Sequence, residues 1–367
     1  MSMYNNFIIV VCFIISLNAG EEKRAVWVVR DALLSKESID NIISTAVGAE
    51  ITDLFVQVRA LGQVYYHSTV EKWAPGIDET FDPLSLVIEK AKRYGIRVHA
   101  WINVFYVWAG DTRPDSSHIL IKQHEAVLCK DNFPTYAELK KAGTEGFYLD
   151  PASNKVKKHI LAIVGELINN YNLDGIHYDY FRYPGIGYSF TPASRTKFRM
   201  QNFFDPYLIY NAGLFHEPGL YNVFKHADSL YRSYLNRELT DFLGWTNQMI
   251  KEKNPDLSLS IAVKPDPIVA KHRYFQDWTE WIKKGVCDFV VVMNYRTDWQ
   301  EFVNILSVIK AFEVSDKVIV GISTFNQNEQ AVRKRILYVR KEAFNGFSLF
   351  SFNHMVKNKS YLYKLLL

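Results

Sequence analysis

Apolar residues in this chain recur in short runs typical of β-strands, and helical patterns separate nearly all of these runs. Several runs are continuously apolar, as expected for strands that are buried on both faces of a parallel sheet. The pattern predicts eight strands, over residues 24–30, 52–59, 96–103, 173–179, 257–263, 287–295, 317–323 and 346–352.

The segments between these strands carry the spacing and end signals of amphipathic helices. Asp82-Pro83 and Gly95 mark the start and the end of one helix, and Ser35 is placed to cap another. The helix before the fourth strand has a single apolar stripe, made of Val156, Ile160, Ile163, Val164, Leu167 and Tyr171.

Eight strand–helix units in 367 residues fit an α/β fold of the (β/α)₈ TIM-barrel type better than a doubly wound sheet. Two connections are long, at about 104–152 after the third strand and 185–230 after the fourth. Both are expected on the C-terminal face of the barrel, where enzymes with this fold build their sites. No linker or low-complexity segment divides the chain, so we expect one domain.

The N-terminal segment is expected to be a signal peptide, residues 1–20, that precedes a barrel domain over 21–367. Residues 7–17 form an apolar run of signal-peptide length, and the small residues Ala19 and Gly20 follow it. The first six residues lack Lys and Arg, which leaves an uncleaved membrane anchor open. We therefore expect a secreted, periplasmic or cell-envelope-associated protein.

Charge and cysteine content exclude several classes of partner. The net charge of +4 is mild and does not indicate a nucleic-acid binder. Cys129 and Cys287 lie far apart without metal-ligand spacing, and the histidines are scattered, so neither a metal site nor a cofactor is indicated. Aromatic residues make up 15% of the chain, and such rings can stack on the apolar faces of sugars.

Polar residues cluster near the ends of the predicted strands. Alternate strand residues of a barrel point inward, and the last of these is exposed at the catalytic face. On this parity the fourth strand places Asp179 at the rim and His177 one layer below it. The other candidates at or near strand ends are Asp31, Gln57, Arg59, His99, Trp101, Asn103, Lys264, Asp266 and Asn294.

Each candidate also has a purely structural interpretation. His177 could be a buried, hydrogen-bonded residue, Trp101 could belong to the core, and Arg59 could pair with Asp179 or Asp31 inside the barrel. Asp174 begins its strand and is expected to be structural. The polar ring as a whole is more specific than any one of its members.

The motifs at these strand ends identify a resemblance to the glycosyl hydrolase-like family 10 proteins. The most specific segments are HAWIN, residues 99–103, and DGIHYDYFRYP, residues 174–184, and the similarity covers nearly the whole mature chain. The resemblance implies a (β/α)₈ barrel distantly akin to the alpha-amylase-type glycosidases. In those enzymes an aspartate at the end of the fourth strand attacks the anomeric carbon, and Asp179 occupies that place.

The chain departs from the amylase-type pattern at the second carboxylate. After the fifth strand it reads AVKPDP, where Asp266 is near but the positive Lys264 favours an anion over a general acid. The glutamates that xylanase-type barrels carry at the ends of the fourth and seventh strands are absent from the predicted strand ends.

The sequence thus predicts a glycoside hydrolase that acts on a polysaccharide or cell-wall glycan. Asp179 would be the nucleophile or base, and Asp31 and Asp266 are the candidate acids. Hydroxyl contacts would come from Arg59, His99, Asn103 and His177, and ring stacking from Trp101 and Tyr180; Lys264 and Asn294 complete the binding set. A barrel that binds glycans without cleaving them, and a structural envelope protein, remain alternatives, and the oligomeric state is open.

Overall fold

The structure, a computed structural model, describes residues 22–128, 144–211, 219 and 221–356. The predicted signal peptide, residues 1–20, lies outside the described residues, as does Cys129. No described helix combines the length and the apolar character that are needed to cross a membrane.

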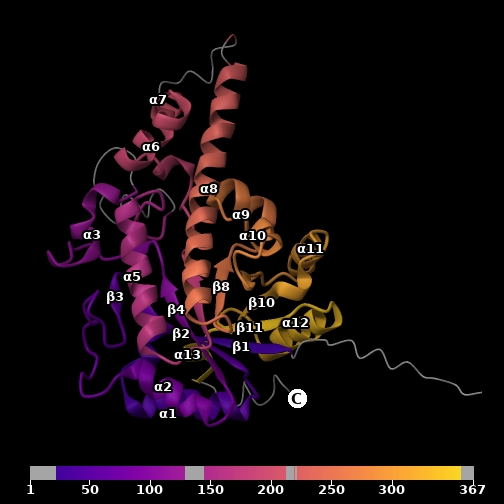
Figure 1. Ribbon diagram of the computed structural model, residues 1–367. Helices are drawn as coiled ribbons and strands as arrows, with labels where there is room; N and C mark the ends of the chain where they lie inside the picture. The colour runs from indigo at the N-terminus through magenta and orange to yellow at the C-terminus, as the bar shows by residue number, and fades with distance from the viewer. Residues whose placement is uncertain (1–21, 129–143, 212–218, 220, 357–367) are drawn as a thin grey trace, which may run out of the picture.

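Eight parallel strands close into a barrel that helices surround (Figure 1). Each predicted strand is confirmed, with ends within about two residues of those expected. The barrel strands are β1 (Lys23–Val28), β2 (Asp53–Ala60), β4 (Arg97–Asn103), β7 (Gly175–Asp179), β8 (Ser258–Val263), β9 (Phe289–Met293), β10 (Val318–Ser323) and β11 (Gly346–Phe350). Closure occurs at β1, which pairs in parallel with both β2 and β11.

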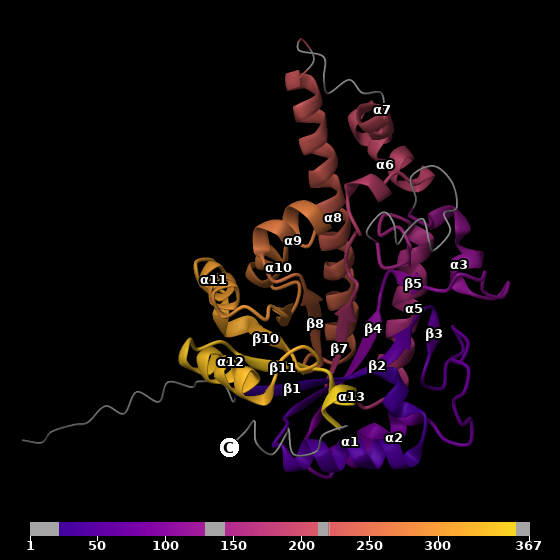
Figure 2. The same ribbon diagram turned by 180° about the vertical axis from the view of Figure 1, so that it is seen from behind.

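Helices connect successive barrel strands and pack against the outside of the barrel (Figure 2). Those that follow the first, second and third strands are α1 (Lys36–Gly48), α2 (Pro83–Lys92), α3 (Ile119–Lys122) and α5 (Asn154–Asn170). The later ones are α6 (Pro192–Asn202), α7 (Pro206–Asn211), α8 (Tyr221–Lys253), α9 (Pro267–Tyr274), α10 (Trp278–Lys283), α11 (Trp299–Lys310), α12 (Glu329–Lys341) and α13 (Phe352–Met355).

The two long connections contain additional elements near the carboxyl ends of the strands. The first carries β5 (Tyr106–Trp108) and β6 (Phe147–Tyr148), which pair with each other in an antiparallel ribbon. The second contains α6, α7 and the 33-residue α8, which extends well beyond the barrel in Figure 1. A short hairpin strand, β3 (Gln63–Val64), also folds back on the end of β2.

Two apolar layers follow from the alternation of side chains along the strands. The barrel interior contains Ala25, Trp27, Phe55, Trp101, Phe289, Val291 and Ile319. The opposite faces of the same strands join the helices in one large core. Gly175 is required inside the barrel because a β-carbon there would overlap the His99 ring and Ser258.

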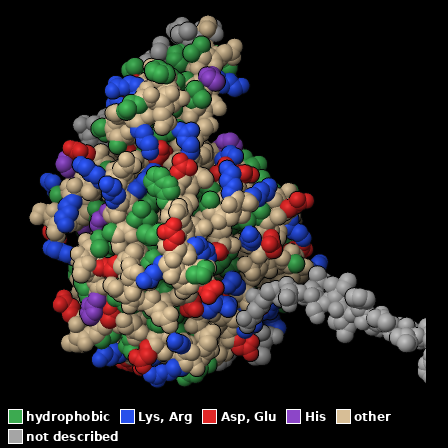
Figure 3. All heavy atoms as spheres, in the orientation of Figure 1, with side chains coloured by type: hydrophobic (Ala, Val, Ile, Leu, Met, Phe, Trp, Pro, Cys, Tyr) green, Lys and Arg blue, Asp and Glu red, His purple; other side chains and the backbone are tan. Residues whose placement is uncertain are grey.

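Charged side chains of both signs are interspersed over the body of the face shown in Figure 3. This distribution agrees with the mild net charge of +4. It gives no indication of a nucleic-acid partner.

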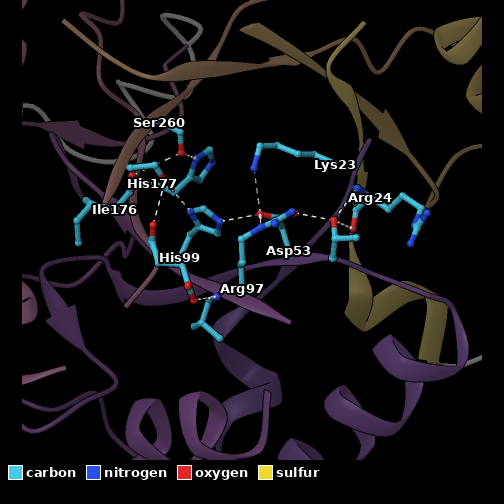
Figure 4. Close-up of polar contacts among 12 residues, drawn as sticks. Lys23, Arg24, Asp53, Arg97, His99, Ile176, His177 and Ser260 are labelled. Carbon is cyan, nitrogen blue, oxygen red and sulfur yellow. Dashed lines mark hydrogen bonds and ion pairs between the residues drawn. The ribbon is translucent and has the colours of Figure 1, made fainter. Parts of the chain in front are cut away.

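Asp53 anchors a buried polar cluster at the amino end of the barrel (Figure 4). Arg97 donates two hydrogen bonds to its carboxylate at 2.9 and 2.8 Å, and His99 Nε2 donates a third at 2.9 Å. Lys23 Nζ lies 3.6 Å away. Burial opposes ionisation of Asp53, but the Arg97 and His99 bonds outweigh it and lower its pKa.

We expect Asp53→Asn to lower the free energy of unfolding by about 3 kcal/mol, because it leaves buried donors without their anion. Since the pKa is lowered in the fold, wild-type stability from this group is present above pH 3.8, the ordinary value for aspartate, and is lost as the pH falls below it. Urea unfolding at several pH values measures both effects.

Asp40→Asn is the matched control, because Asp40 is 60% exposed and pairs with Lys90 on the surface. Its effect should stay within about 0.5 kcal/mol. Equal losses for the two variants would contradict the role given to Asp53.

Candidate active site

A cavity of about 460 Å³ opens at the carboxyl end of the barrel; we call it the rim cavity. Its walls come from strand ends and from the loops that directly follow them. The lining includes Trp27, Arg30, Gln57, Leu61, Trp101, Asn103, Tyr106, Glu145, Asp179, Tyr180, Arg182, Lys264, Met293, Tyr295 and Phe350.

Asp179, the last residue of β7, is a buried carboxyl group in this cavity, with 8% of its surface exposed. Within the described chain its one hydrogen bond comes from the Tyr180 backbone N–H, which donates to Oδ1 at 2.7 Å. Burial raises its pKa and outweighs the opposing effects of the Arg182 charge and the Tyr180 N–H. The protonated form is therefore favoured relative to an aspartate in water.

The residues after Asp179 form a layered arrangement of rings and a guanidinium. Tyr180 has a left-handed backbone with φ of 52°, an outlier for a bulky residue. Its ring stacks on Tyr106 with centroids 4.5 Å apart, and the Arg182 guanidinium lies 4.6 Å from the Tyr180 ring centre. Strained positions of this kind persist where the surroundings over-determine them, often at functional sites.

Glu145 supplies a second carboxylate to the rim cavity. Arg182 Nη2 donates to it at 2.8 Å, and the Tyr148 hydroxyl donates at 2.9 Å. Burial opposes its ionisation, but the Arg182 charge and the Tyr148 bond prevail and its pKa is lowered. The cavity thus holds two carboxyl groups whose environments shift their pKa values in opposite directions.

Two buried donors at the cavity lack an acceptor in the described chain, Trp101 Nε1–H and Arg182 Nε–H. The Trp101 indole is close enough to Asp179 to favour its anion, although no hydrogen bond of regular geometry joins them. Buried donors normally have partners, so these two are available to oxygen atoms of a bound molecule.

Lys264 and a polar relay complete the walls. Burial and the Arg182 charge lower the pKa of Lys264, whose ammonium lies 5.0 Å from the Tyr274 ring centre. Gln57 Oε1 accepts from Arg30 Nη1 at 3.1 Å, and Gln57 Nε2 donates to Asn103 Oδ1 at 3.3 Å. This relay fixes the Asn103 amide before any ligand binds.

Six of the candidate site residues line the rim cavity: Gln57, Trp101, Asn103, Asp179, Tyr180 and Lys264. Their roles in binding or catalysis stay predictions. The other predicted residues lie elsewhere, for separate physical reasons.

His99 and His177 do not line the rim cavity. Figure 4 shows them in the polar cluster that includes Asp53 and Ser260. The Trp27 indole donates to His177 Nε2 at 3.1 Å, so the other ring nitrogen, Nδ1, carries the proton and donates to Ser260 Oγ at 2.9 Å. Burial, with a smaller effect from His99, lowers the pKa of His177 well below its ordinary value. His177 positions Trp27, which does line the cavity.

Arg59 faces the outside of the barrel because β2 contains a bulge. Gln57 pairs with Trp101 on β4, but Arg59 pairs with Ile102, so one extra residue separates them. A bulge of one residue reverses the face of every later side chain. Arg59 therefore pairs with Glu71 at 2.7 Å. The sequence predicted that it would contact sugar hydroxyls, with an ion pair to Asp179 or Asp31 inside the barrel as the structural alternative.

Asn294 follows β9 with the opposite parity to its neighbours. Met293 and Tyr295 line the cavity, while Asn294 Nδ2 donates to the Phe302 carbonyl at the start of α11. The prediction chose Asn294 because it nearly ends the sixth strand, but Phe289 and Val291 face the barrel interior, so alternation places Met293 and Tyr295 inward and Asn294 outward.

The two predicted acids, Asp266 and Asp31, are not brought to the cavity lining. Asp266 caps α9, where Oδ1 accepts from the Ile268 and Val269 backbone N–H groups at 2.9 and 3.0 Å. Asp31 lies in the short 3₁₀ segment Arg30–Leu33 with 72% of its side chain exposed. The residue before it, Arg30, lines the cavity instead.

Sequence reasoning missed Glu145 and Arg182 as site residues. Arg182 stands inside the quoted segment DGIHYDYFRYP, three residues after Asp179, and this proximity was a usable signal. Glu145 lies in the long connection after the third strand, where no hydrophobic periodicity predicts the direction in which a side chain points. Among the described residues, no group of three His, Cys, Asp or Glu side chains is placed to hold a metal ion.

Fold and cavity together define a (β/α)₈-barrel protein with the architecture of glycoside hydrolases. The chain belongs to the Glycosyl hydrolase-like 10 family, which matches residues 22–325.

Two relatives carry the name of glycosyl hydrolases. The chain is 21% identical to glycosyl hydrolase DigH of Escherichia coli O6:H1 over 269 residues, which cover 67% of this chain and 54% of DigH. It is 22% identical to glycosyl hydrolase YngK of Bacillus subtilis over 326 residues, which cover 79% of this chain and 57% of YngK. The matches span little more than half of those proteins.

Solved structures of glycoside hydrolases share the fold. The glycoside hydrolase domain of PgaB (BpsB) from Bordetella bronchiseptica superposes with a TM-score of 0.73 at 13% identity, covering 93% of this chain and 97% of that domain. The catalytic domain of a beta-amylase from Paenibacillus polymyxa gives a TM-score of 0.55 at 13% identity, covering 92% and 94% of the two chains.

We expect Asp179→Asn to raise the free energy of unfolding at pH 7 by about 1 kcal/mol. Because the fold raises the pKa of Asp179, its stabilising effect is present below pH 3.8 and is lost as the pH rises through the folded-state value. The gain should therefore shrink between pH 7 and pH 4. Urea unfolding at both pH values measures it.

Asp150→Asn is the contrasting variant. Burial also raises the pKa of Asp150, but its carboxyl group accepts from the Ala152 N–H at 2.8 Å, from the Ser194 hydroxyl at 2.9 Å and from the Thr191 hydroxyl. Its amide would lose acceptors and destabilise the fold by about 1–3 kcal/mol. A loss of stability in Asp179→Asn as well would show that Asp179 is held for structure.

Proposed function

We propose that the rim cavity hydrolyses a glycosidic bond of a polysaccharide or cell-wall glycan, with Asp179 as the essential carboxyl group. The observation that carries this proposal is the pair of carboxyl groups with opposite pKa shifts in one aromatic-lined cavity. Glycoside hydrolysis uses one protonated and one ionised carboxyl group. When the surroundings of two carboxyl groups shift their pKa values apart, the group with the raised pKa is suited to be the acid and the group with the lowered pKa is suited to be the anion.

Asp179 fits the acid role better than the nucleophile role expected from the sequence. Its burial favours the proton that a general acid must carry to the leaving oxygen. Glu145, kept ionised by Arg182, is the group that would stabilise positive charge at the sugar ring or activate water. The Trp101 ring lines the cavity and could contact the apolar side of a sugar, whereas the Tyr180 ring is already covered by Tyr106 and Arg182.

Glycan binding without cleavage is the second candidate, and one observation favours it. Glu145 is engaged by Arg182 at 2.8 Å and by the Tyr148 hydroxyl at 2.9 Å, and such contacts weaken a carboxylate as a base or nucleophile. We also propose that the protein is exported, on the basis of the predicted signal segment, residues 1–20.

The test is reducing-end release by the purified protein from a panel of glycans that includes cell-wall fragments. Wild type should cleave at least one glycan, and Asp179→Asn should lose about 10²–10⁴-fold in kcat because it cannot donate a proton. Activity should decline as the pH rises above the raised pKa of Asp179.

Asp266→Asn serves as the matched carboxyl variant, because Asp266 caps a helix and does not line the cavity. It should keep kcat within about twofold, with a stability change of about 1 kcal/mol or less. Full activity in Asp179→Asn would refute the proposal. Binding of a glycan with no product from wild type would establish the binding protein.

A further inference from the structure

A second cavity, of about 560 Å³, opens beside the rim cavity; we call it the side cavity. Its walls come from the hairpin after β2, from the start of α3 and from α5, and Figure 1 and Figure 2 both place β3 and α3 on the side of the barrel that α5 covers. The two cavities share no lining residue. Nothing in the proposed reaction uses the side cavity.

The partition between the two cavities includes a two-residue turn. Ala60 on β2 pairs with Gln63 on β3, so Leu61 and Gly62 form the loop, and their φ values of 53° and 67° are those of a tight hairpin turn. Leu61 lines the rim cavity and Gly62 lines the side cavity. A glycan that extends from the rim cavity across this turn would therefore enter the side cavity.

His118 holds this turn in place through hydrogen bonds. Its Nε2–H donates to the Leu61 carbonyl at 2.8 Å, while Nδ1 accepts from the Leu120 N–H at 3.1 Å. A β-carbon on Gly62 would lie 2.5 Å from His118 Nε2, so glycine alone allows the close approach. The turn is therefore held in close contact with His118.

The inner wall of the side cavity is held in place by internal pairing. Arg59 donates to both Glu71 oxygens at 2.7 Å, and His159 Nε2 donates to Glu71 Oε1 at 2.7 Å. Burial opposes ionisation of Glu71, but the Arg59 charge and the His159 bond lower its pKa to about 2. Glu71 is thus a fixed anion of the wall and not a proton donor.

The remaining lining suits a neutral molecule with many hydroxyl groups. Half-buried Trp73, whose ring packs against His67 with centroids 4.7 Å apart, lines the cavity, and Gln63 and Ser117 offer hydrogen-bonding groups. Charges of the two signs nearly balance in the lining, with Glu71, Glu79 and Asp115 against Lys72 and Lys122. An anionic ligand would meet at least as much repulsion as attraction, and an apolar one would leave these polar groups without partners.

We propose that the side cavity binds further sugar units of the same glycan, so that the chain crosses the Leu61–Gly62 turn and stacks a pyranose on Trp73. This inference rests on the proposed function for the assignment of the rim cavity to a glycan. If the side cavity binds in this way, the affinity of the protein for an oligosaccharide increases once the oligosaccharide is long enough to reach Trp73.

The experiment measures the binding of neutral chitin oligosaccharides, from the disaccharide to the hexasaccharide, by calorimetry. The Asp179→Asn protein is the background, so that no cleavage occurs. Affinity should rise with length, and Trp73→Ala should remove that rise, weakening the longest oligosaccharide about 3- to 10-fold. The disaccharide should bind the two proteins equally, and Trp73→Phe should restore most of the rise.

Trp245→Ala is the control, because Trp245 is another half-exposed tryptophan, on α8, and lines neither cavity. It should leave every affinity unchanged. Affinity that does not depend on length, no binding at any length, or equal effects of Trp73→Ala and Trp245→Ala would overturn the inference.

The two proposals can fail separately. Length-dependent binding that needs Trp73, in a protein whose wild type releases no reducing ends, would keep the side-cavity assignment and refute hydrolysis. Cleavage that requires Asp179, with no effect of Trp73→Ala on any oligosaccharide, would keep the hydrolase and remove the side cavity from it.

Discussion

Closure of the parallel ladder at β1 is the constraint on which the rest of the structure depends. β1 pairs with β2 on one side and β11 on the other, so all eight carboxyl ends meet in one ring. Side-chain parity then decides what reaches the ring's centre, and Trp27, Trp101 and Asp179 do so. Polar atoms enclosed by the barrel must find partners there, as His177 does with Trp27 and Ser260.

Electrostatic conditions differ between the two ends of this barrel. At the amino end the Asp53 anion is fully matched by Arg97, His99 and Lys23. At the carboxyl end Arg182 is shared between Glu145, which it contacts, and Asp179, which it only influences at a distance. Because Arg182 contacts Glu145 and not Asp179, Glu145 stays ionised and Asp179 tends to hold its proton, while Lys264 influences both carboxyl groups only at a distance.

The sequence was sufficient for the barrel, because eight runs with the right period and separation leave few alternatives. It also located Asp179, since the last inward residue of a strand follows from parity. Parity failed at Arg59, where a bulge reverses the face, whereas Asn294 was chosen for its place near the strand end although the alternation from Phe289 and Val291 points it outward. Asp266 was near the ring in sequence but caps a helix, and Glu145 reaches the cavity only through the tertiary path of a long connection.

The segment DGIHYD shows the family most clearly in the sequence, yet most of its residues have structural roles in the barrel. Asp174 accepts from the Val98 N–H, Gly175 leaves room for the His99 ring, His177 supports Trp27, and Tyr178 reaches Thr246 behind the barrel. The Asp179 side chain has the smallest part in this packing, since the one hydrogen bond that its carboxyl group accepts within the described chain comes from the adjacent Tyr180 N–H. A relative that lacked the proposed reaction would therefore keep almost the whole segment. Retention of the motif among distant relatives reports inheritance of the barrel, and position 179 alone bears on the proposed reaction.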